Sequence, residues 1–368
     1  MKILVLSSHT PSLFWFRMDM MKAFICKGHT VIAAAQESVE QWSEQFKAQG
    51  IEYCQVFVQR NGVNPLNDLR SLKEIRLLMQ EIQPDKVFVY QAKTVIYGAL
   101  AASRLNIKEV YPLIAGLGSI FRGKGIKNKI LRAVVLILYR IAFARSKKVI
   151  FQNDDDRDVL LARNLLKTEQ VEKINGSGVN LEQFTPSPMP EKPAFLFIGR
   201  LIRDKGVMEY LEACKQLKAK HKDISCLLVG PFDSNPSALK KEELDVYINA
   251  GIVEYFGEQK DVKPFIERSS VFVLPSYHEG TPKTVLEAMA MGRAIITTDA
   301  PGCRETVIDG VNGYLVETKN VEQLVEKMEY LMLHPEIALN MGQEGLNMVR
   351  EKFDVKKVNA DILRIMEL

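Results

Sequence analysis

Four charged residues in the second half of the chain, two carboxylates and two cations, stand just after stretches that the sequence predicts to be buried strands. In the stretch VFVLPSYHEGTPKTVLE, from Val271 to Glu287, an apolar strand pattern gives way to a short polar loop and then to an apolar helix pattern. Glu279 lies in the loop, and Glu287 lies about 7 Å further along the helix than Pro282. Carboxylates spaced around a diphosphate can accept hydrogen bonds from sugar hydroxyls on either side of it, and a nucleotide sugar has this layout.

The helix that follows the loop predicts an anion site. Thr281 suits the N-cap position, Pro282 suits the first helical position, and Gly292 suits the C-terminal cap. The first helical amides have no carbonyl partner within the helix, and the positive end of the helix dipole attracts an anion. These amides belong to Lys283, Thr284 and Val285. Spacing alone leaves a plainer alternative open, in which Glu279 is a solvated loop residue and Glu287 an ordinary helical one.

A second stretch, FLFIGRLIRDKG from Phe195 to Gly206, predicts a buried strand that ends at Gly199. Arg200 and Lys205 follow in the connecting loop, which is where an open α/β sheet binds its ligand. Arginine can hold a phosphate in a bidentate manner and lysine acts as a point charge. A basic surface turn is the alternative, because Arg203 occupies the same loop.

Taken together, the two stretches resemble the donor site of glycosyltransferase family 4. The motif GR-x4-KG is followed by PS-x2-EG and by a second Glu after seven intervening residues. The resemblance implies a GT-B fold, in which two Rossmann-like domains face each other across a cleft. It further implies that Arg200 and Lys205 hold the donor diphosphate, that Glu279 contacts the transferred sugar, and that Glu287 contacts the ribose. The donor-site residues implied in this way are Gly199, Arg200, Lys205, Gly280, Lys283, Thr284, Val285 and Glu287, and the catalytic ones are Glu279, Arg200 and Lys205. The PGCRETV stretch is similar to the family's glycine-rich turn, with Gly302 and Glu305.

The resemblance implies a retaining glycosyltransferase that needs no metal and uses a nucleotide sugar, most closely a UDP-sugar. The chain is similar to the bacterial subgroup that builds undecaprenyl-linked O-antigen, lipopolysaccharide, capsule or glycoprotein oligosaccharides. We therefore expect an N-acetylhexosamine donor. A GT-B sugar-nucleotide epimerase, a soluble sucrose- or glucan-type transferase and a non-catalytic GT-B scaffold subunit remain as alternatives. A fourth reading, a basic module that binds membranes or nucleic acid, would leave the donor-site residues unexplained.

Composition is that of a globular protein of two domains. The 368 residues are 47% hydrophobic and 26% charged, and no apolar run reaches the roughly 20 residues that cross a bilayer. The five cysteines lack a CxxC spacing, and the five histidines lack HxH or HExxH, so we expect no disulfide framework or metal site and a cytoplasmic location. We predict strands and helices alternating in two doubly wound parallel sheets.

The domain boundary is predicted in the proline-rich stretch FTPSPMPEKP. We expect an acceptor-binding domain over residues 1–184, a linker over 185–193, and a nucleotide-sugar domain over 194–352. The resemblance implies that the last helix, 353–368, packs back on the first domain. Within the first half the predicted strands are 3–7, 30–35, 86–91, 110–114, 148–152 and 171–175, and the predicted helices are 16–27, 66–81, 94–104 and 127–144.

Charge is unevenly distributed between the halves. Residues 1–185 hold 26 Lys and Arg against 17 Asp and Glu, a net charge of +9, whereas the remainder holds 23 against 28, a net charge of −5. Residues 111–153 contain nine basic residues and no acidic one, which favours peripheral contact with an anionic membrane surface through a helix with its apolar face inward and its basic rim outward. No nucleic-acid recognition motif accompanies this charge, so we expect no nucleic-acid partner. We expect a lipid-linked saccharide acceptor near His9, Arg17, Gly118, Arg122 and Lys124.

Two nucleotide-binding motifs are incomplete in this half. GLG at Gly116–Gly118 has Phe121 in place of the third glycine of a dinucleotide fingerprint. GSIFRGKG, at 118–125, has Gly125 where a P-loop needs a Ser or Thr for Mg²⁺. NAD binding and a P-loop are therefore disfavoured.

Overall fold

The computed structural model describes residues 1–59, 62, 64–118, 121, 125–233, 235 and 237–368, and divides them into two compact units. The first unit comprises residues 1–177 and 355–368, and the second comprises residues 178–354. The proline-rich stretch 185–193, expected to be the linker, lies within the second unit instead. It is held there because the buried guanidinium of Arg293 donates hydrogen bonds to the carbonyls of Ser187 and Pro188, at 2.8 and 2.9 Å.

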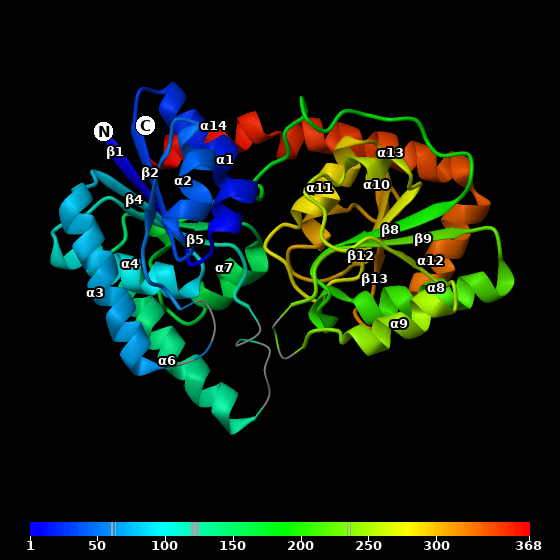
Figure 1. Ribbon diagram of the computed structural model, residues 1–368, viewed down its shortest axis with the longest axis horizontal. Helices are drawn as coiled ribbons and strands as arrows, with labels where there is room; N and C mark the ends of the chain where they lie inside the picture. Colours follow the sequence, from blue (N-terminus) through cyan, green and yellow to red (C-terminus); the bar gives the residue numbers. More distant parts are fainter. Residues whose placement is uncertain (60–61, 63, 119–120, 122–124, 234, 236) are drawn as a thin grey trace. The chain divides into compact units, whose positions relative to one another are not determined.

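The first unit is built on a seven-stranded parallel sheet in the order β3-β2-β1-β4-β5-β6-β7 (Figure 1). Its strands are β1 (Lys2–Leu6), β2 (Thr30–Ala35), β3 (Glu52–Gln55), β4 (Lys86–Tyr90), β5 (Val110–Ile114), β6 (Val149–Phe151) and β7 (Val171–Lys173). Its helices are α1 (Thr10–Cys26), α2 (Val39–Lys47), α3 (Pro65–Ile82), α4 (Ala92–Arg104), α6 (Ile126–Phe143), α7 (Asp154–Leu161) and α14 (Val355–Ile365). Strand order reverses between β1 and β4, since the chain leaves β1 toward β2 and leaves β4 toward β5.

Alternating side chains of the central strands feed two cores on opposite faces of this sheet. Leu4 and Leu6 of β1 pack with residues of α3, α4 and α6, whereas Ile3 and Val5 pack with residues of α1 and α14. The alternation follows from the two-residue period of a strand, and burial on both faces is the reason that these strands are apolar throughout. The last helix, α14, contributes Val358, Ile362 and Ile365 to the same core as α1, and Figure 1 shows the two helices side by side.

The second unit is built on a six-stranded parallel sheet in the order β10-β9-β8-β11-β12-β13. Its strands are β8 (Ala194–Ile198), β9 (Ser225–Val229), β10 (Glu254–Tyr255), β11 (Val271–Leu274), β12 (Ala294–Thr298) and β13 (Gly313–Val316). Its helices are α8 (Val207–Lys220), α9 (Lys241–Asn249), α10 (Lys263–Glu267), α11 (Lys283–Ala290), α12 (Val321–Leu333) and α13 (Pro335–Met348). Here the strand order reverses between β8 and β11, which pair directly, with Val271 beside Phe195.

The prediction of two doubly wound parallel sheets is confirmed. The sequence prediction omitted the helices α2 and α7. It also omitted two four-residue strands at sheet edges, β3 and β13, which are too short and too partly exposed to carry a clear apolar pattern. It also placed the start of the first helix at Phe16, but α1 begins at Thr10. The earlier start has a local reason, because His9 is extended and Pro11 suits the first turn of a helix.

Candidate functional site

The loops that follow β8 and β11, together with helix α11, carry the residues predicted to bind a phosphorylated donor. Because β8 and β11 are neighbours at the point where strand order reverses, the loops that follow them lie at the carboxyl edge where an open α/β sheet has its ligand crevice. Lys205 and Glu279 meet there: the Lys205 ammonium donates a hydrogen bond to Glu279 Oε1. The structure therefore brings together two of the three residues predicted to be catalytic.

Glycine at position 206 explains how these two loops approach so closely. Gly206 has φ of +73°, and a Cβ at this position would lie 2.1 Å from the carbonyl oxygen of Pro275 at the end of β11. The amide of Tyr277 and the hydroxyl of Ser276 both donate to the carbonyl of Asp204, at 2.9 and 3.2 Å. The KG pair of the motif is thus a lysine for the site and a glycine for the close contact that positions it.

The glycine-rich turn after β12 supports the Glu279 loop from the other side. The amide of Glu279 donates to the carbonyl of Pro301, at 2.8 Å. Gly302 has φ of +79°, and a Cβ there would lie 2.2 Å from the Glu279 carbonyl oxygen and 2.5 Å from that of Gly280. Glu305 follows in a short 3-10 helix, Arg304–Thr306. Any side chain at position 302 would therefore displace the loop that holds Glu279.

The helix predicted to bind an anion, α11, begins one residue later than expected. Pro282, not Thr281, is the N-cap residue, with φ of −72° and ψ of 109°, and α11 starts at Lys283. The Val285 amide, one of the three expected to face an anion, donates to the Pro282 carbonyl at 3.1 Å. The hydroxyl of Thr284 donates to the carbonyl of Ile198 at 3.4 Å, which joins the helix start to the end of β8. The predicted C-terminal cap is present, since Gly292 has φ of +78° just after the helix.

Arg200 follows Gly199 at the end of β8 and forms an ion pair with Asp233, with Nη1 and Oδ2 2.8 Å apart. Asp233 lies in the loop after β9. That loop packs closely against the Arg200 loop because position 230 is a glycine. A Cβ at Gly230 would lie only 1.8 Å from the Gly199 carbonyl oxygen. Sequence reasoning missed Asp233. The one available signal was its place four residues after the apolar run that forms β9, the strand beside the one that leads to Arg200.

Glu287 is buried on α11, with Lys283 Nζ 3.7 Å from its Oε1. Burial raises the pKa of Glu287 to about 7, and the nearby Lys283 ammonium opposes that rise. A buried carboxyl in this helix differs from an ordinary exposed helical Glu, because its ionised form lacks the solvation that an exposed residue would have.

Replacing Glu287 with glutamine is expected to stabilise the protein at pH 8 and to change little at pH 5. The folded protein holds the Glu287 proton more tightly than the unfolded chain, whose pKa is near 4.5. The free energy of unfolding therefore falls as pH rises from the unfolded pKa near 4.5 to the folded pKa of about 7. Above pH 7 the loss of stability is about 3 kcal/mol. Urea unfolding of Glu287→Gln and wild type at both pH values measures the difference. An equal difference at pH 5 and pH 8 would contradict the assignment.

The residues expected to bind an acceptor belong to the first unit where the structure describes them. His9 precedes α1 and contacts Glu37, with His9 Nδ1 2.8 Å from Glu37 Oε1. Arg17 is buried on α1 with its guanidinium 5.0 Å from the centre of the Tyr90 ring, so it acts as a core cation rather than an exposed contact. Gly118 is exposed. Arg122 and Lys124 lie outside the described residues.

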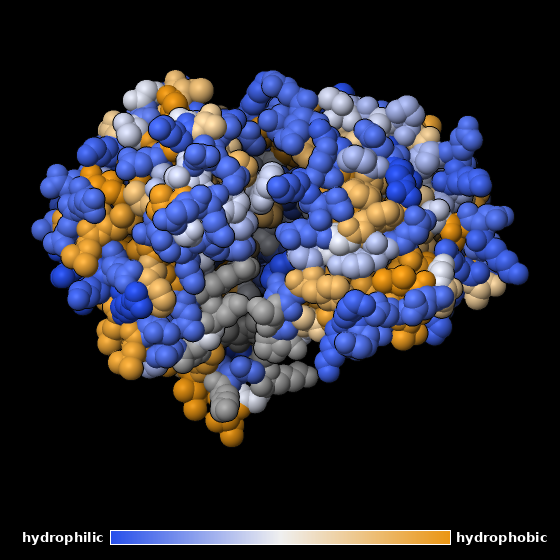
Figure 2. All heavy atoms as spheres, in the orientation of Figure 1, coloured by the Kyte–Doolittle hydropathy of each residue, from blue (hydrophilic) through white to orange (hydrophobic). Residues whose placement is uncertain are grey.

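The prediction that the basic helix turns its apolar face inward holds for only part of α6. Tyr139, Ala142 and Phe143 are buried in the core of the first unit. A second apolar row faces solvent, however, formed by Ile126, Ile130, Val134 and Ile137, which are 77%, 61%, 46% and 60% exposed. Intervals of four, four and three residues place the row on one side of the helix. Figure 2 shows hydrophobic atoms gathered at the lower end of this helix.

Within the described part of the chain, no three His, Cys, Asp or Glu side chains are grouped so as to hold a metal ion. A search of the same residues finds no helix that combines the length and apolar character needed to span a bilayer.

Comparison with known proteins places this geometry in a family. Residues 181–348 match the family model described as glycosyl transferases group 1, and residues 2–153 match the model described as glycosyl transferase 4-like. A relative from Campylobacter jejuni is 30% identical over 360 residues, which cover 94% of this chain and 93% of the relative. The chain belongs to glycosyltransferase family 4.

Named relatives of this family 4 glycosyltransferase act on lipid-linked saccharides. The Campylobacter protein is named N,N'-diacetylbacillosaminyl-diphospho-undecaprenol alpha-1,3-N-acetylgalactosaminyltransferase. An Escherichia coli relative, 22% identical over 82% of each chain, is named UDP-Gal:alpha-D-GlcNAc-diphosphoundecaprenol alpha-1,3-galactosyltransferase. Among solved structures, Anabaena HepE in complex with UDP superposes with a TM-score of 0.78 at 16% identity, covering the whole of both chains. This likeness shows that the fold is GT-B.

Proposed function

We propose that this glycosyltransferase transfers an N-acetylhexosamine, with retention of configuration, from a UDP-sugar to an undecaprenyl-diphosphate-linked saccharide in the synthesis of a bacterial surface polysaccharide or glycan. The observation that carries the proposal is the contact of Lys205 with Glu279 across the loops that follow two neighbouring strands, β8 and β11, with Arg200 at the end of β8 and Glu287 on α11. Cations for a diphosphate and carboxylates for hydroxyls at one crevice suit a nucleotide sugar.

In the proposed reaction, the bond between the sugar C1 and the diphosphate oxygen breaks, and a bond between C1 and the acceptor hydroxyl oxygen forms on the same face. The hydroxyl proton passes to the departing diphosphate, so the reaction needs neither a protein nucleophile nor a metal. Arg200, Lys205 and the first amides of α11 stabilise the charge that develops on the diphosphate. Glu279 orients the transferred sugar and Glu287 the ribose.

Support for the sugar and the acceptor comes from the relatives. The name of the Campylobacter relative specifies an N-acetylgalactosaminyl group, and both named relatives make an alpha linkage to a saccharide on undecaprenyl diphosphate. An alpha linkage from an alpha-linked UDP-sugar is the outcome of retention. We place the reaction at the cytoplasmic face of the membrane, in keeping with cysteines that are all free within the described residues.

A ligand panel tests the donor site. Thermal unfolding is measured with UDP, GDP, ADP, UDP-GalNAc, UDP-GlcNAc, UDP-Gal and UDP-Glc, with EDTA present throughout. UDP and one UDP-sugar are expected to stabilise the protein selectively, by about 2.7 kcal/mol at a concentration of 100 Kd. Absence of stabilisation by every nucleotide would reject the proposal and favour a scaffold subunit.

Product analysis tests the reaction itself. The stabilising UDP-sugar is incubated with undecaprenyl-diphosphate-linked saccharides, and the anomeric configuration of the product is read by NMR. An alpha-linked product formed in EDTA is expected. A beta-linked product would overturn retention, dependence on added Mg²⁺ or Mn²⁺ would overturn metal independence, and a changed UDP-sugar formed without acceptor would identify an epimerase.

Peripheral membrane contact forms a second part of the proposal, and α6 is the surface that supports it. Its exposed row of Ile126, Ile130, Val134 and Ile137 adjoins basic residues of the same helix, among them Lys129 and Arg140, and its sequence contains no acidic residue. Apolar side chains that enter the acyl boundary beside cations that meet anionic headgroups are typical of a helix lying in a membrane interface.

Changing Ile130 and Ile137 together to glutamate is expected to weaken binding to phosphatidylglycerol vesicles roughly tenfold or more, because two apolar groups are lost and two repelling charges are gained. Sedimentation of the full chain with vesicles measures the effect. Val246→Glu, at an exposed apolar residue of α9 in the second unit, is the matched control and should bind as wild type does. Equal weakening by the control variant would show that net charge, and not the α6 row, governs binding.

A further inference from the structure

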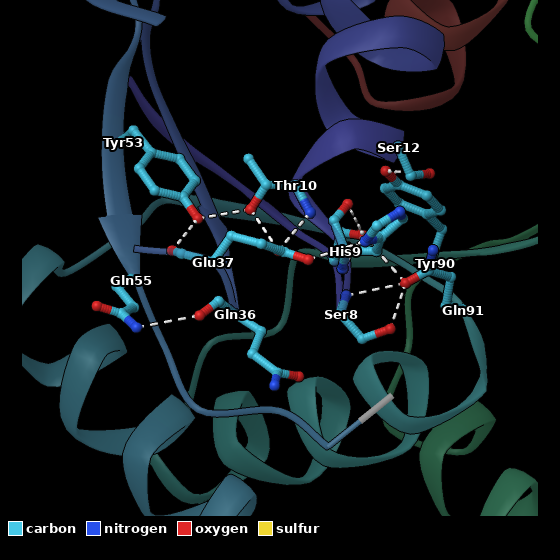
Figure 3. A network of polar contacts seen from close by, with 11 residues as sticks. Ser8, His9, Thr10, Ser12, Gln36, Glu37, Tyr53, Gln55, Tyr90 and Gln91 are labelled. Atoms are coloured by element: carbon cyan, nitrogen blue, oxygen red, sulfur yellow. Dashed lines mark hydrogen bonds and ion pairs between the residues drawn. The ribbon is translucent and has the colours of Figure 1, made fainter. Parts of the chain in front are cut away.

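A second set of polar residues lies at the carboxyl edge of the first sheet, outside the donor site. Ser7, Ser8 and His9 follow β1, Glu37 follows β2, and Gln91 follows β4. Strand order reverses between β1 and β4, which pair directly, so these residues occupy the position in the first unit where an open α/β sheet binds ligands. Figure 3 shows Ser8, His9, Glu37 and Gln91 close together in a network of polar contacts, and Ser7 joins it through hydrogen bonds with Gln91 and with the His9 amide.

Glu37 is the fixed centre of one half of this network. Its Oε2 accepts hydrogen bonds from the amide and from the hydroxyl of Thr10, both at 2.7 Å, and its Oε1 lies 2.8 Å from His9 Nδ1. Tyr53 closes the arrangement, with its hydroxyl 2.7 Å from the Glu37 carbonyl oxygen. Although half-burial opposes ionisation, these donors lower the pKa of Glu37 to about 2, so the carboxylate is ionised at neutral pH.

The protonation pattern of His9 follows from this arrangement. An ionised carboxylate only accepts hydrogen bonds, so the proton between Glu37 and His9 belongs to His9 Nδ1. In the neutral ring, the opposite nitrogen, Nε2, then carries a lone pair and accepts hydrogen bonds. The His9 side chain is 28% exposed, and no residue in the described part of the chain hydrogen-bonds its Nε2.

Gln91 is the fixed centre of the other half. Its Oε1 accepts hydrogen bonds from the Ser8 amide at 2.9 Å, from the Ser8 hydroxyl at 2.5 Å and from the Ser7 hydroxyl at 3.0 Å. Since a backbone amide can only donate, it fixes the carboxamide orientation and leaves the Nε2 donors of Gln91 on the other side. The backbone of Gln91, with φ of 74° and ψ of 141°, occupies a region that is normally reserved for glycine. Such strain persists where the surroundings fix it, and it clusters at ligand sites.

We propose that His9 Nε2 and the Gln91 carboxamide bind the acceptor saccharide, with His9 accepting a hydrogen bond from a sugar hydroxyl and Gln91 donating one to a sugar oxygen. Glu37 is a positioning residue that acts through His9, because it holds the ring in the form whose exposed nitrogen is an acceptor. The inference rests on the proposed transferase function and assigns its acceptor site to side chains of the first unit.

The Glu37→Gln variant tests the positioning role directly. Thr10 donates twice to one oxygen of Glu37, so the carboxamide oxygen of the glutamine takes that place and its NH₂ group faces His9 Nδ1. Nδ1 must then accept, and the ring proton moves to Nε2. NMR of the full chain labelled with ¹⁵N-histidine reads the tautomer without any substrate. We expect the Nδ1–H form in wild type and the Nε2–H form in the variant. The Nε2–H form in wild type, or an unchanged tautomer in the variant, overturns the inference.

The His9→Asn variant tests binding, because an asparagine amide keeps a donor for Glu37 while the Nε2 acceptor is lost. The KM for the lipid-linked acceptor is expected to rise about tenfold, the effect of losing one hydrogen bond to a substrate hydroxyl. Gln36→Ala is the matched control, since Figure 3 shows the Gln36 side chain directed away from Glu37. Stabilisation by UDP should be unchanged in both variants. If UDP still stabilises His9→Asn and the acceptor KM is unchanged, the acceptor assignment fails; if UDP fails to stabilise wild type, it is the transferase proposal that fails.

Discussion

Replacing Lys205 with methionine is expected to lower kcat roughly 10²–10³-fold, the effect of removing one preorganised group that stabilises developing charge. The ammonium of Lys205 sits between the loops after β8 and β11, where it donates to Glu279. In the proposed reaction the diphosphate leaves with an additional negative charge, and a fixed cation lowers the energy of that state more than the energy of the bound donor. Removal of Arg200 should have a comparable effect, because its guanidinium is held by Asp233 beside the same crevice.

The measurement is the initial transfer rate at saturating donor, with calorimetric titration of UDP to separate binding from chemistry. Arg203→Ala provides the matched control: Arg203 belongs to the same loop, but its guanidinium forms a surface ion pair with Glu243. Surface pairs contribute about 0–1 kcal/mol, so this variant should keep wild-type rate. A Lys205→Met enzyme with near-wild-type kcat would remove Lys205 from the mechanism, whatever its effect on UDP affinity.

Replacing Arg293 with methionine is expected to destabilise the protein by about 3–5 kcal/mol and to lower its Tm by roughly 10 °C. The guanidinium is fully buried and donates to the carbonyl oxygens of Ser187, Pro188, Ile266, Glu267 and Met291 and to the hydroxyl of Ser187. Methionine fills much of the volume but leaves these acceptors without donors in a dry environment, which is costly. Burial lowers the pKa of Arg293 to about 10, so the group remains charged at neutral pH.

Differential scanning calorimetry measures the change. Arg293→Lys should fall between wild type and Arg293→Met, because one ammonium cannot replace a planar group that reaches several carbonyls. Arg268→Ala is the control from the same region, since Arg268 pairs with Glu254 at the surface and its loss should shift Tm little. A Tm for Arg293→Met within 2 °C of wild type, on the order of what a neutral surface change produces, would disprove the anchoring role.

Local sequence signals sufficed for much of this protein, because strands buried on both faces are apolar throughout and each part of the predicted donor-site motif is a short contiguous stretch. Local signals did not suffice where the position or partner of a residue depends on contacts with residues distant in sequence. The pairing of Arg200 with Asp233 joins loops after different strands, and nothing in either loop alone specifies it. Arg17 is a cation in a helix pattern, and only packing beside Tyr90 makes it a core residue.

Boundaries failed for a related reason. Four prolines between 184 and 193 forbid regular structure and so predict a linker, but they do not reveal whether a folded domain captures the segment. Arg293, about a hundred residues later, captures it. The exposed surface of α6 was also not predicted. An apolar residue in a sequence pattern is expected in the core, but the row that begins at Ile126 faces solvent.

The carboxylates that accept from Arg200 and Lys205 also bear on how the enzyme completes its cycle. A crevice with two uncompensated cations would retain the nucleoside diphosphate after transfer and would collect phosphate from the surroundings between turnovers. Asp233 and Glu279 give each cation an internal partner to return to, so a departing product leaves no bare charge behind. Product release is rate-limiting in many enzymes, and in the proposed reaction these two ion pairs would favour it at the expense of ground-state affinity for the spent nucleotide.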